Sequence, residues 1–255
     1  MTPWVKRLLI ANVVVFFFTQ STPRLAMLLA FYPSILDTIP RPWTPFTYMF
    51  VHANLGHIFF NMLGLFFFGP RLEARLGSKH FLMLWVLSGL GGAALTLLFG
   101  DRIPIVGASG ALFGVFLGFA MFWPREQIYI WGIIPIQARV LVALMTGLSL
   151  YAGFGGISDG IAHFGHLGGF VGGFLFLKWI EMRSPSRQFK KKAYAHVAPN
   201  PAKDPGHLRR WQEVDREQLH EVNRAEFDRL MAKIEGSGMN SLTLDERAFL
   251  DRFSA

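Results

Sequence analysis

Residues 107–123 have the sequence GASGALFGVFLGFAMFW, the most informative segment of the chain. It is apolar almost throughout, and Gly110, Gly114 and Gly118 recur every four residues. That spacing is typical of closely packed membrane helices, because small residues let two backbones approach each other. Ser109 lies near the start of the segment, between small neighbours.

A second segment, residues 162–173, has the sequence AHFGHLGGFVGG and repeats the pattern. Gly165, Gly169 and Gly173 share the four-residue spacing, and two histidines lie beside them. The two small-residue faces predict helices that pack closely enough for a short imidazole to reach a serine. Helix packing alone also explains the glycines. A histidine at membrane depth, however, is costly unless it has a function.

The composition predicts membrane helices over most of the chain as well. The 255 residues are 52% apolar and only 16% charged, and the mean hydropathy is +0.34. Residues 1–182 hold apolar runs broken by Gly, Pro and short charged clusters, whereas residues 183–255 are polar and charged. A water-soluble domain needs polar outer faces, which the first part lacks. The chain is therefore predicted to be an all-α polytopic membrane protein.

Six apolar segments are the expected spans: residues 6–20, 54–70, 79–99, 107–123, 136–153 and 161–180. With six spans, most Lys and Arg fall on one side, and the other keeps only Arg24, Arg41 and Arg102. The positive-inside rule then places both termini in the cytoplasm of a cell (inner) membrane. The first segment resembles a signal peptide, but no convincing cleavage site follows it, so we expect a retained span.

The connection over residues 21–50 is long and rich in Pro and aromatic residues. Its apolar character argues against disorder, so we expect a loop partly embedded at the outer interface. Four side chains are expected in the aromatic belt of that interface: Trp43, Phe46, Tyr48 and Phe50.

The chain changes character after Arg183. Residues 183–206 are expected to form a basic, Pro-containing linker, and residues 207–255 a small soluble helical hairpin on the cytoplasmic side. Apolar residues recur at helical spacing over 207–235. Thr243 and Glu246 have the spacing of a capping box, which predicts the start of a short last helix.

The net charge of +8 lies mostly in loops and the tail. Anionic lipid on the cytoplasmic face explains this charge more simply than nucleic acid does, so the expected partner surface is the bilayer. The chain has no cysteine. Disulfides, thiol catalysis and thiolate metal sites are therefore excluded.

A serine and a histidine at membrane depth suggest a protease that works inside the membrane, and three chemistries are open to such an enzyme. A zinc enzyme needs a His-Glu-x-x-His helix, which the sequence lacks, so no metal is expected. An aspartyl enzyme needs two carboxylates within spans, whereas Asp101 and Asp159 are placed in short loops. Serine chemistry remains.

Ser109 is the candidate nucleophile. Gly107, Ala108 and Gly110 clear the space around its hydroxyl, and a serine that begins a helix adjoins free backbone N–H groups able to receive an oxyanion. A serine hydroxyl needs a base within hydrogen-bond reach. A hydroxyl bonded back to its own helix is the alternative.

Two histidines on the later segment could supply that base. His166 is favoured because it lies deeper in the glycine-rich stretch, between Gly165 and Gly168. His163 is three residues earlier and can also face the interior. We expect it to support the site or contact a loop.

A further polar cluster precedes and enters the second span: His52, His57 and Asn61. His57 and Asn61 are four residues apart and share a helix face. They could join spans as polar contacts. Alternatively, their N–H groups stabilise a tetrahedral oxyanion together with the backbone N–H of Ser109, each donor contributing about 3 kcal/mol to the barrier.

Together these motifs resemble the rhomboid proteases. The resemblance covers roughly residues 5–182 and rests on Gly-x-Ser-Gly at Ser109, His-x-x-Gly-x-x-x-Gly at His166, and His-x-x-x-x-His-x-x-x-Asn ending at Asn61. Glu73-Ala74-Arg75-Leu76-Gly77-Ser78 also looks like the acidic-basic cytoplasmic turn of that family.

The resemblance implies a six-helix bundle with a Ser–His dyad and no acid. Ser109 would be the nucleophile, His166 the base, and His57 and Asn61 the oxyanion donors. It implies cleavage of single-span membrane proteins near the outer face, without a cofactor. Gly107, Gly110, Phe113, Gly169, Gly173, His52 and His163 would support the site.

Two positions depart from the family pattern. Some members have Trp-Arg in the first loop where this chain has Trp43-Thr44, which removes an arginine contact. Some have a tyrosine beneath the catalytic histidine where this chain has Phe113, which can still stack on an imidazole but has no hydroxyl. Both departures bear on loop anchoring or rate rather than on the dyad.

Two other functions compete with proteolysis. A catalytically silent relative would bind or escort membrane clients, but such proteins usually lose the serine or the histidine. A small-solute transporter would need paired charges or a broken-helix ion site at mid-membrane, and neither pattern is present. The sequence does not indicate a physiological substrate or an oligomeric state.

Overall fold

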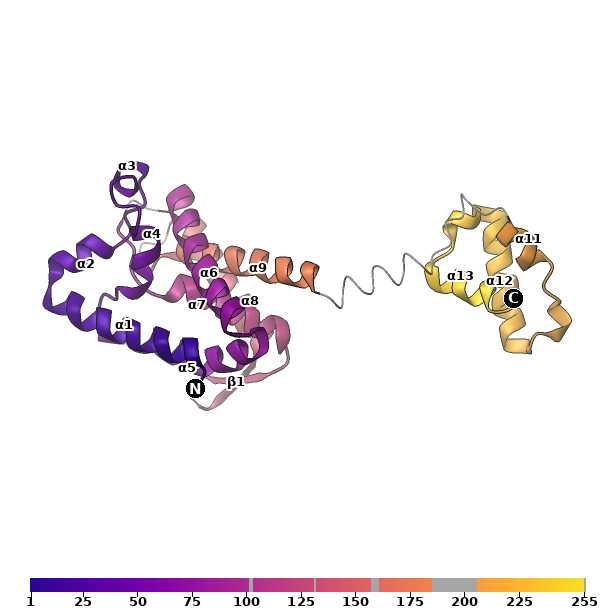
Figure 1. The fold of residues 1–255 in the computed structure, drawn as a ribbon, viewed down its shortest axis with the longest axis horizontal. Coiled ribbons are helices and arrows are strands. Elements are labelled where there is room, and N and C mark those ends of the chain that lie inside the picture. Colours follow the sequence, from indigo (N-terminus) through magenta and orange to yellow (C-terminus); the bar gives the residue numbers. More distant parts are fainter. Residues whose placement is uncertain (101–102, 131, 157–160, 185–205, 255) are drawn as a thin grey trace. The chain divides into compact units, whose positions relative to one another are not determined.

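The computed structural model describes residues 1–100, 103–130, 132–156, 161–184 and 206–254. The chain forms two compact units, Met1–Glu181 and Met182–Ala255 (Figure 1). Asp101, Asp159 and most of the expected linker, residues 185–205, lie outside the described residues.

The first unit contains six long helices, each coinciding with one expected span. They are α1 Pro3–Ser21, α5 Leu55–Leu76, α6 Ser78–Phe99, α7 Ser109–Phe122, α8 Ala138–Phe154 and α9 His163–Arg183. Two of them, α5 and α6, are long and apolar enough to cross a membrane, judged by length and composition alone.

The connection between α1 and α5 is more ordered than expected. It contains α2 Pro23–Leu29, α3 Ile35–Thr38, α4 Thr44–Thr47 and the 3-10 turn η1 Tyr48–Phe50. The expected belt position of Tyr48 is wrong: its ring is buried and its hydroxyl donates to the carbonyl of Gly89 on α6, 2.8 Å away. A buried phenol finds a hydrogen-bond partner, and here the partner is backbone. Trp43 and Phe46 remain exposed.

The chain is not purely helical, which corrects the all-α expectation. Strands β1 Gln127–Ile130 and β2 Ile134–Gln137 form an antiparallel hairpin between α7 and α8, in register from Gln127–Gln137 to Ile130–Ile134. Isoleucine-rich sequence favours strand, and Gly132 supplies the positive φ of 72° in the turn. The fifth helix therefore begins at Ala138 rather than at residue 136.

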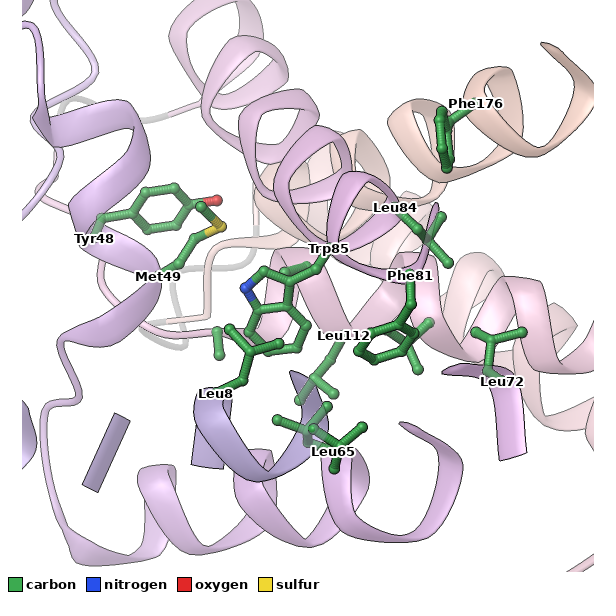
Figure 2. Packing of buried hydrophobic residues seen from close by; sticks show 14 of the residues in the cluster. Leu8, Tyr48, Met49, Leu65, Leu72, Phe81, Leu84, Trp85, Leu112 and Phe176 are labelled. Carbon is green, nitrogen blue, oxygen red and sulfur yellow. The ribbon is translucent and has the colours of Figure 1, made fainter. Parts of the chain in front are cut away.

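Buried side chains from five of the long helices meet in one core (Figure 2). Trp85 and Phe81 of α6 lie at its centre and are fully buried. In Figure 2 they lie between Leu8 of α1, Leu65 of α5 and Leu112 of α7. This packing holds α6 against both α5 and α7.

Glu73 joins three elements at one end of this core. Its carboxylate is 2% exposed and accepts hydrogen bonds from the backbone N–H groups of Trp4 and Val5, at 2.9–3.1 Å, and from the hydroxyl of Ser78, at 2.7 Å. Free N–H groups at a helix start need such acceptors. The acidic residue of the expected cytoplasmic turn therefore caps α1 and fixes the α5–α6 junction.

Glycines let α9 approach its neighbours at backbone distance, as their spacing predicted. A Cβ on Gly169 would collide with the carbonyl of Gly110, and a Cβ on Gly173 would lie 2.9 Å from the Cα of Gly114. Gly168 meets α6 in the same way, against Gly91. Helix α9 thus contacts both α6 and α7 through backbone.

The second unit has its own core. It contains α11 Gly206–Gln212, η2 Arg216–Gln218, α12 Glu221–Ser237, η3 Met239–Ser241 and α13 Leu244–Asp251. The capping box of Thr243 and Glu246 is confirmed. The continuous helix expected over 207–235 is wrong, because the Asp215 side chain accepts from the N–H of Glu217 and starts a separate turn. The core comprises Trp211, Phe227, Leu230, Met231, Ile234, Leu242 and Leu250.

Candidate active site

Ser109 is the first residue of α7. The preceding residue, Ala108, is already close to helical conformation, and the first α-helical bond joins the N–H of Leu112 to the carbonyl of Ala108 at 2.9 Å. The N–H groups of residues 109–111 therefore have no acceptor four residues back. A helix start of this kind presents donors to a developing negative charge.

His166 lies in the first turn of α9, facing Ser109. Its Nε2 is 2.9 Å from the Ser109 Oγ, within hydrogen-bond distance. Both side chains are half-buried, so the pair is neither sealed in the core nor fully exposed. The contact between Gly110 and Gly169 brings the two helices close enough for the short imidazole to span the gap.

Phe113 fixes the plane of the His166 ring. The two rings stack with centroids 4.1 Å apart and an interplanar angle of 15°. Phe170 packs edge-on against the same phenyl ring, with centroids 4.9 Å apart. Stacking restricts tilting of the imidazole out of this plane.

His163 occupies a different position. Its ring centroid is 6.3 Å from that of His166, and the two rings are nearly perpendicular. The structure thus brings His166, rather than His163, to Ser109.

Backbone contacts with the α1–α5 connection hold the segment that leads into Ser109. Ile105 and Phe31 exchange two backbone hydrogen bonds, and the N–H of Gly107 donates to the carbonyl of Tyr48 at 3.0 Å. The N–H of Ala108 points to Nε2 of His52, 3.4 Å away. The connection therefore sets the position at which α7 begins.

His52 is buried beneath this segment. Burial is the main cause that lowers its pKa, to about 4, and the neighbouring His57 lowers it further. The ring is therefore neutral at pH 7, and a neutral imidazole can accept the N–H of Ala108.

His57 lies directly against the same segment. Gly107 has a φ of +116°, and a Cβ there would lie 2.5 Å from Nε2 of His57. Only glycine allows this approach. The His57 ring also packs edge-on against His52, with centroids 5.0 Å apart.

The Asn61 amide is partly committed to its own helix. Its Nδ2 donates to the backbone carbonyl of His57, one turn back, at 2.8 Å. Its Oδ1 is buried and has no hydrogen-bond partner in the described part of the chain. One amide proton and one acceptor of Asn61 are therefore uncommitted beside the His57 ring.

Sequence reasoning missed two residues that build this site. Tyr48 reaches between α6 and α7: its hydroxyl would lie 3.1 Å from a Cβ on Gly110 and 2.9 Å from one on Gly92. Phe31 pairs with Ile105 and is 1% exposed. Both belong to the long connection, and their roles depend on partners distant in sequence that no local pattern indicates.

Chemically, the arrangement offers a hydroxyl, an adjacent imidazole and the free N–H groups at the start of α7. These are the parts needed for nucleophilic attack on a carbonyl.

Comparison with known proteins matches residues 40–183 to the Rhomboid domain family, and residues 212–255 to a family of unknown function (DUF6576). The chain is 40% identical over 133 residues to RHOMBOID-like protein 1 of Arabidopsis thaliana, covering 52% of this chain and 33% of that protein. It is 31% identical over 132 residues to Rhomboid protease GluP of Bacillus subtilis (strain 168), covering 52% of this chain and 25% of that protein. The chain thus spans less than half the length of either relative.

Proposed function

Because the chain belongs to the rhomboid family, whose members are membrane proteins, we propose that it is an intramembrane serine endopeptidase. Its substrates would be single-span membrane proteins, cut within or next to their transmembrane segment. The observation that carries the proposal is the 2.9 Å approach of His166 Nε2 to Ser109 Oγ at the start of α7. A protease among the relatives supports it.

In the proposed reaction, His166 takes the proton of Ser109 while Oγ forms a bond to the scissile carbonyl carbon. Negative charge moves to the carbonyl oxygen, where the N–H groups at the start of α7 and donors from His57 and Asn61 stabilise it. Asn61 must turn toward the site or use its second amide proton. His166 then gives its proton to the leaving nitrogen as the C–N bond breaks. Water, activated by the same imidazole, hydrolyses the acyl ester.

The substrate must open before this chemistry. A transmembrane helix keeps its carbonyls in internal hydrogen bonds, because lipid offers no other partners. A hydroxyl can attack one of these carbonyls only where that helix unwinds. Small, helix-weak residues lower the cost of unwinding, so we expect them at the cleaved bond.

We further propose that α1, α5, α6, α7, α8 and α9 all cross the membrane, with both termini in the cytoplasm. The positive-inside distribution of Lys and Arg supports this topology. Ser109 and Phe122 lie at opposite ends of α7, so Ser109 would lie toward the outer face. Cysteines introduced near each end of α7 would report their sides by labelling with a membrane-impermeant reagent.

The proposed organisation is a membrane core over residues 1–182, a linker over 183–206 and a cytoplasmic helical domain over 207–255. Every residue placed in the site precedes Arg183. A chain ending at Ser184 should therefore retain its activity in vesicles. Complete loss of activity in a folded truncated protein would contradict the division.

The direct test is cleavage of a reporter with one transmembrane helix by the full chain in lipid vesicles. Ser109→Ala should remove all product, because it removes the hydroxyl that lies 2.9 Å from His166 Nε2. Ser149→Ala is the matched control, since Ser149 is a serine on another apolar helix, and it should cleave at the unaltered rate. If the unaltered chain retains the reporter without cutting it, the silent client-binding alternative holds instead.

A further inference from the structure

The β1–β2 hairpin presents large apolar side chains that no described residue of the first unit covers. Tyr129 and Ile134 are each 59% exposed and Ile133 is 78% exposed, all at or near the turn. At its base, Ile128 packs against the buried cluster of Phe119, Ala120 and Ala138. The base is therefore anchored to the ends of α7 and α8, and the tip projects away from them.

Arginines surround the base of the hairpin. Arg71 lies over the ring of Trp123, with its Cζ 4.3 Å from the centroid, and pairs with Glu126 at 2.9 Å. Arg125 and Arg139 line an open hollow with Trp123, Pro124 and Glu126. The only carboxylate of this hollow is already engaged by Arg71. Neither Arg125 nor Arg139 has a carboxylate partner among the described residues, so the hollow has an excess of positive charge.

The short length of α7 indicates where the hairpin would sit in a bilayer. The helix has 14 residues, which at 1.5 Å per residue span about 21 Å. The hydrocarbon core is about 30 Å thick. With Ser109 near the outer face, the chain that follows Phe122 is still close to the acyl region, where an exposed apolar tip is favoured over the same tip in water.

From these observations we propose that the hairpin is a lipid-binding element of the leaflet opposite Ser109. Its tip, residues Tyr129, Ile133 and Ile134, inserts among the acyl chains. Arg125 and Arg139 hold the phosphate of an anionic phospholipid at the base. A guanidinium suits phosphate because it donates two parallel hydrogen bonds. The inference rests on the proposed membrane arrangement and is independent of proteolysis.

Because the chain has no cysteine, one introduced cysteine carries the only spin label, and the depth of that label in the bilayer can be measured directly. Ile133→Cys, carrying a nitroxide, is compared in equimolar phosphatidylcholine–phosphatidylglycerol vesicles with two reference sites. Phe67→Cys marks an exposed side chain on α5, and Ser237→Cys marks the exposed end of α12. We expect the Ile133 label to be accessible to oxygen and protected from a water-soluble nickel chelate, as at Phe67.

A label at Ile133 as accessible to the chelate as that at Ser237, with Phe67 still protected, would overturn tip insertion. If the label at Phe67 were also accessible to the chelate, the membrane arrangement itself would be wrong. The two failures are therefore distinguishable.

The headgroup site is tested with spin-labelled phosphatidylglycerol. Arg125→Gln and Arg139→Gln should each lower the preference for this lipid over phosphatidylcholine about five-fold. Arg252→Gln removes the same charge from the second unit and should have no such effect. Inorganic phosphate should not displace the lipid. An unchanged preference in the double Gln variant, or loss of preference on adding phosphate, would overturn the site.

Discussion

The two units of the chain are built for different surroundings. In Met1–Glu181 many large apolar side chains are exposed, Phe67 and Leu148 among them, and α9 packs by backbone contact through glycines. Among the side chains described over residues 206–254 of the second unit, no large apolar one is exposed, and ion pairs such as Lys233–Glu246 lie outside a side-chain core. Backbone contacts therefore set the site geometry in one unit, and side chains set stability in the other.

The largest effect on the cleavage rate is expected from substitution of His166, and this effect distinguishes His166 from His163. His166→Ala removes the base and should lower the cleavage rate by about 10²- to 10⁴-fold. His163→Ala should retain most activity, because the imidazole that contacts the Ser109 hydroxyl is that of His166. The measurement is initial cleavage rate in vesicles at matched protein concentration. Reversed results would assign the base to His163.

The second largest effect is expected from substitution of a glycine at the contact between α9 and α7. Gly169→Ala places a methyl group against the Gly110 carbonyl, so α9 must move away from α7. We expect a loss of about 1–3 kcal/mol of stability and a strong loss of activity. Gly147→Ala on α8 is the control, because a Cβ there meets nothing within 4 Å. Equal thermal stability and activity of the two variants would show that backbone contact does not set the site.

Ring stacking should contribute less. Phe113→Leu loses the stacked contact with His166, and we expect a rate about 3- to 10-fold lower, in line with the free energy of such contacts. Phe113→Tyr keeps the ring and should remain near the unaltered rate. A steeper dependence of rate on pH in the leucine variant would indicate that the ring also affects protonation of His166.

The smallest effect on cleavage is expected from the second unit. Lys233, first among several donors, lowers the pKa of Glu246 to about 2. A carboxylate whose folded-state pKa is depressed adds stability above its unfolded pKa of about 4.3 and loses it as pH falls toward the folded value. Glu246→Gln should therefore destabilise the second unit at pH 7 and flatten its stability between pH 4 and pH 2. Circular dichroism of that unit would record this change, while the cleavage rate stays constant.

Local sequence patterns were sufficient to predict much of the structure of the first unit. Apolar runs located all six long helices, and the glycine spacing predicted the close approach of two of them, which the structure shows at Gly110 and Gly169. The pairing of Ser109 with His166 was expected on the same grounds, and the structure places their atoms within hydrogen-bond distance. Their catalytic roles stay a prediction.

Contacts between distant segments could not be predicted in this way. The aromatic character of Tyr48 indicated an interface, but its hydroxyl bonds Gly89, 41 residues away. Glu73 accepts a hydrogen bond from the backbone N–H of Val5 at the start of α1, and no local motif in either segment indicates this contact. The hairpin residues were expected partly between two spans and partly in the fifth span. Isoleucine is common in strands and in membrane helices alike, so its presence did not distinguish the two. Side-chain direction, as at Asn61, likewise depends on tertiary packing.

The central claim is that His166 activates Ser109. The most direct measurement is reaction of the full chain, in vesicles, with a fluorophosphonate, followed by mapping of the modified peptide. The account predicts one adduct, on Ser109, absent from the His166→Ala variant and present in the His163→Ala variant. Labelling of another serine, or equal labelling of Ser109 without His166, would contradict it.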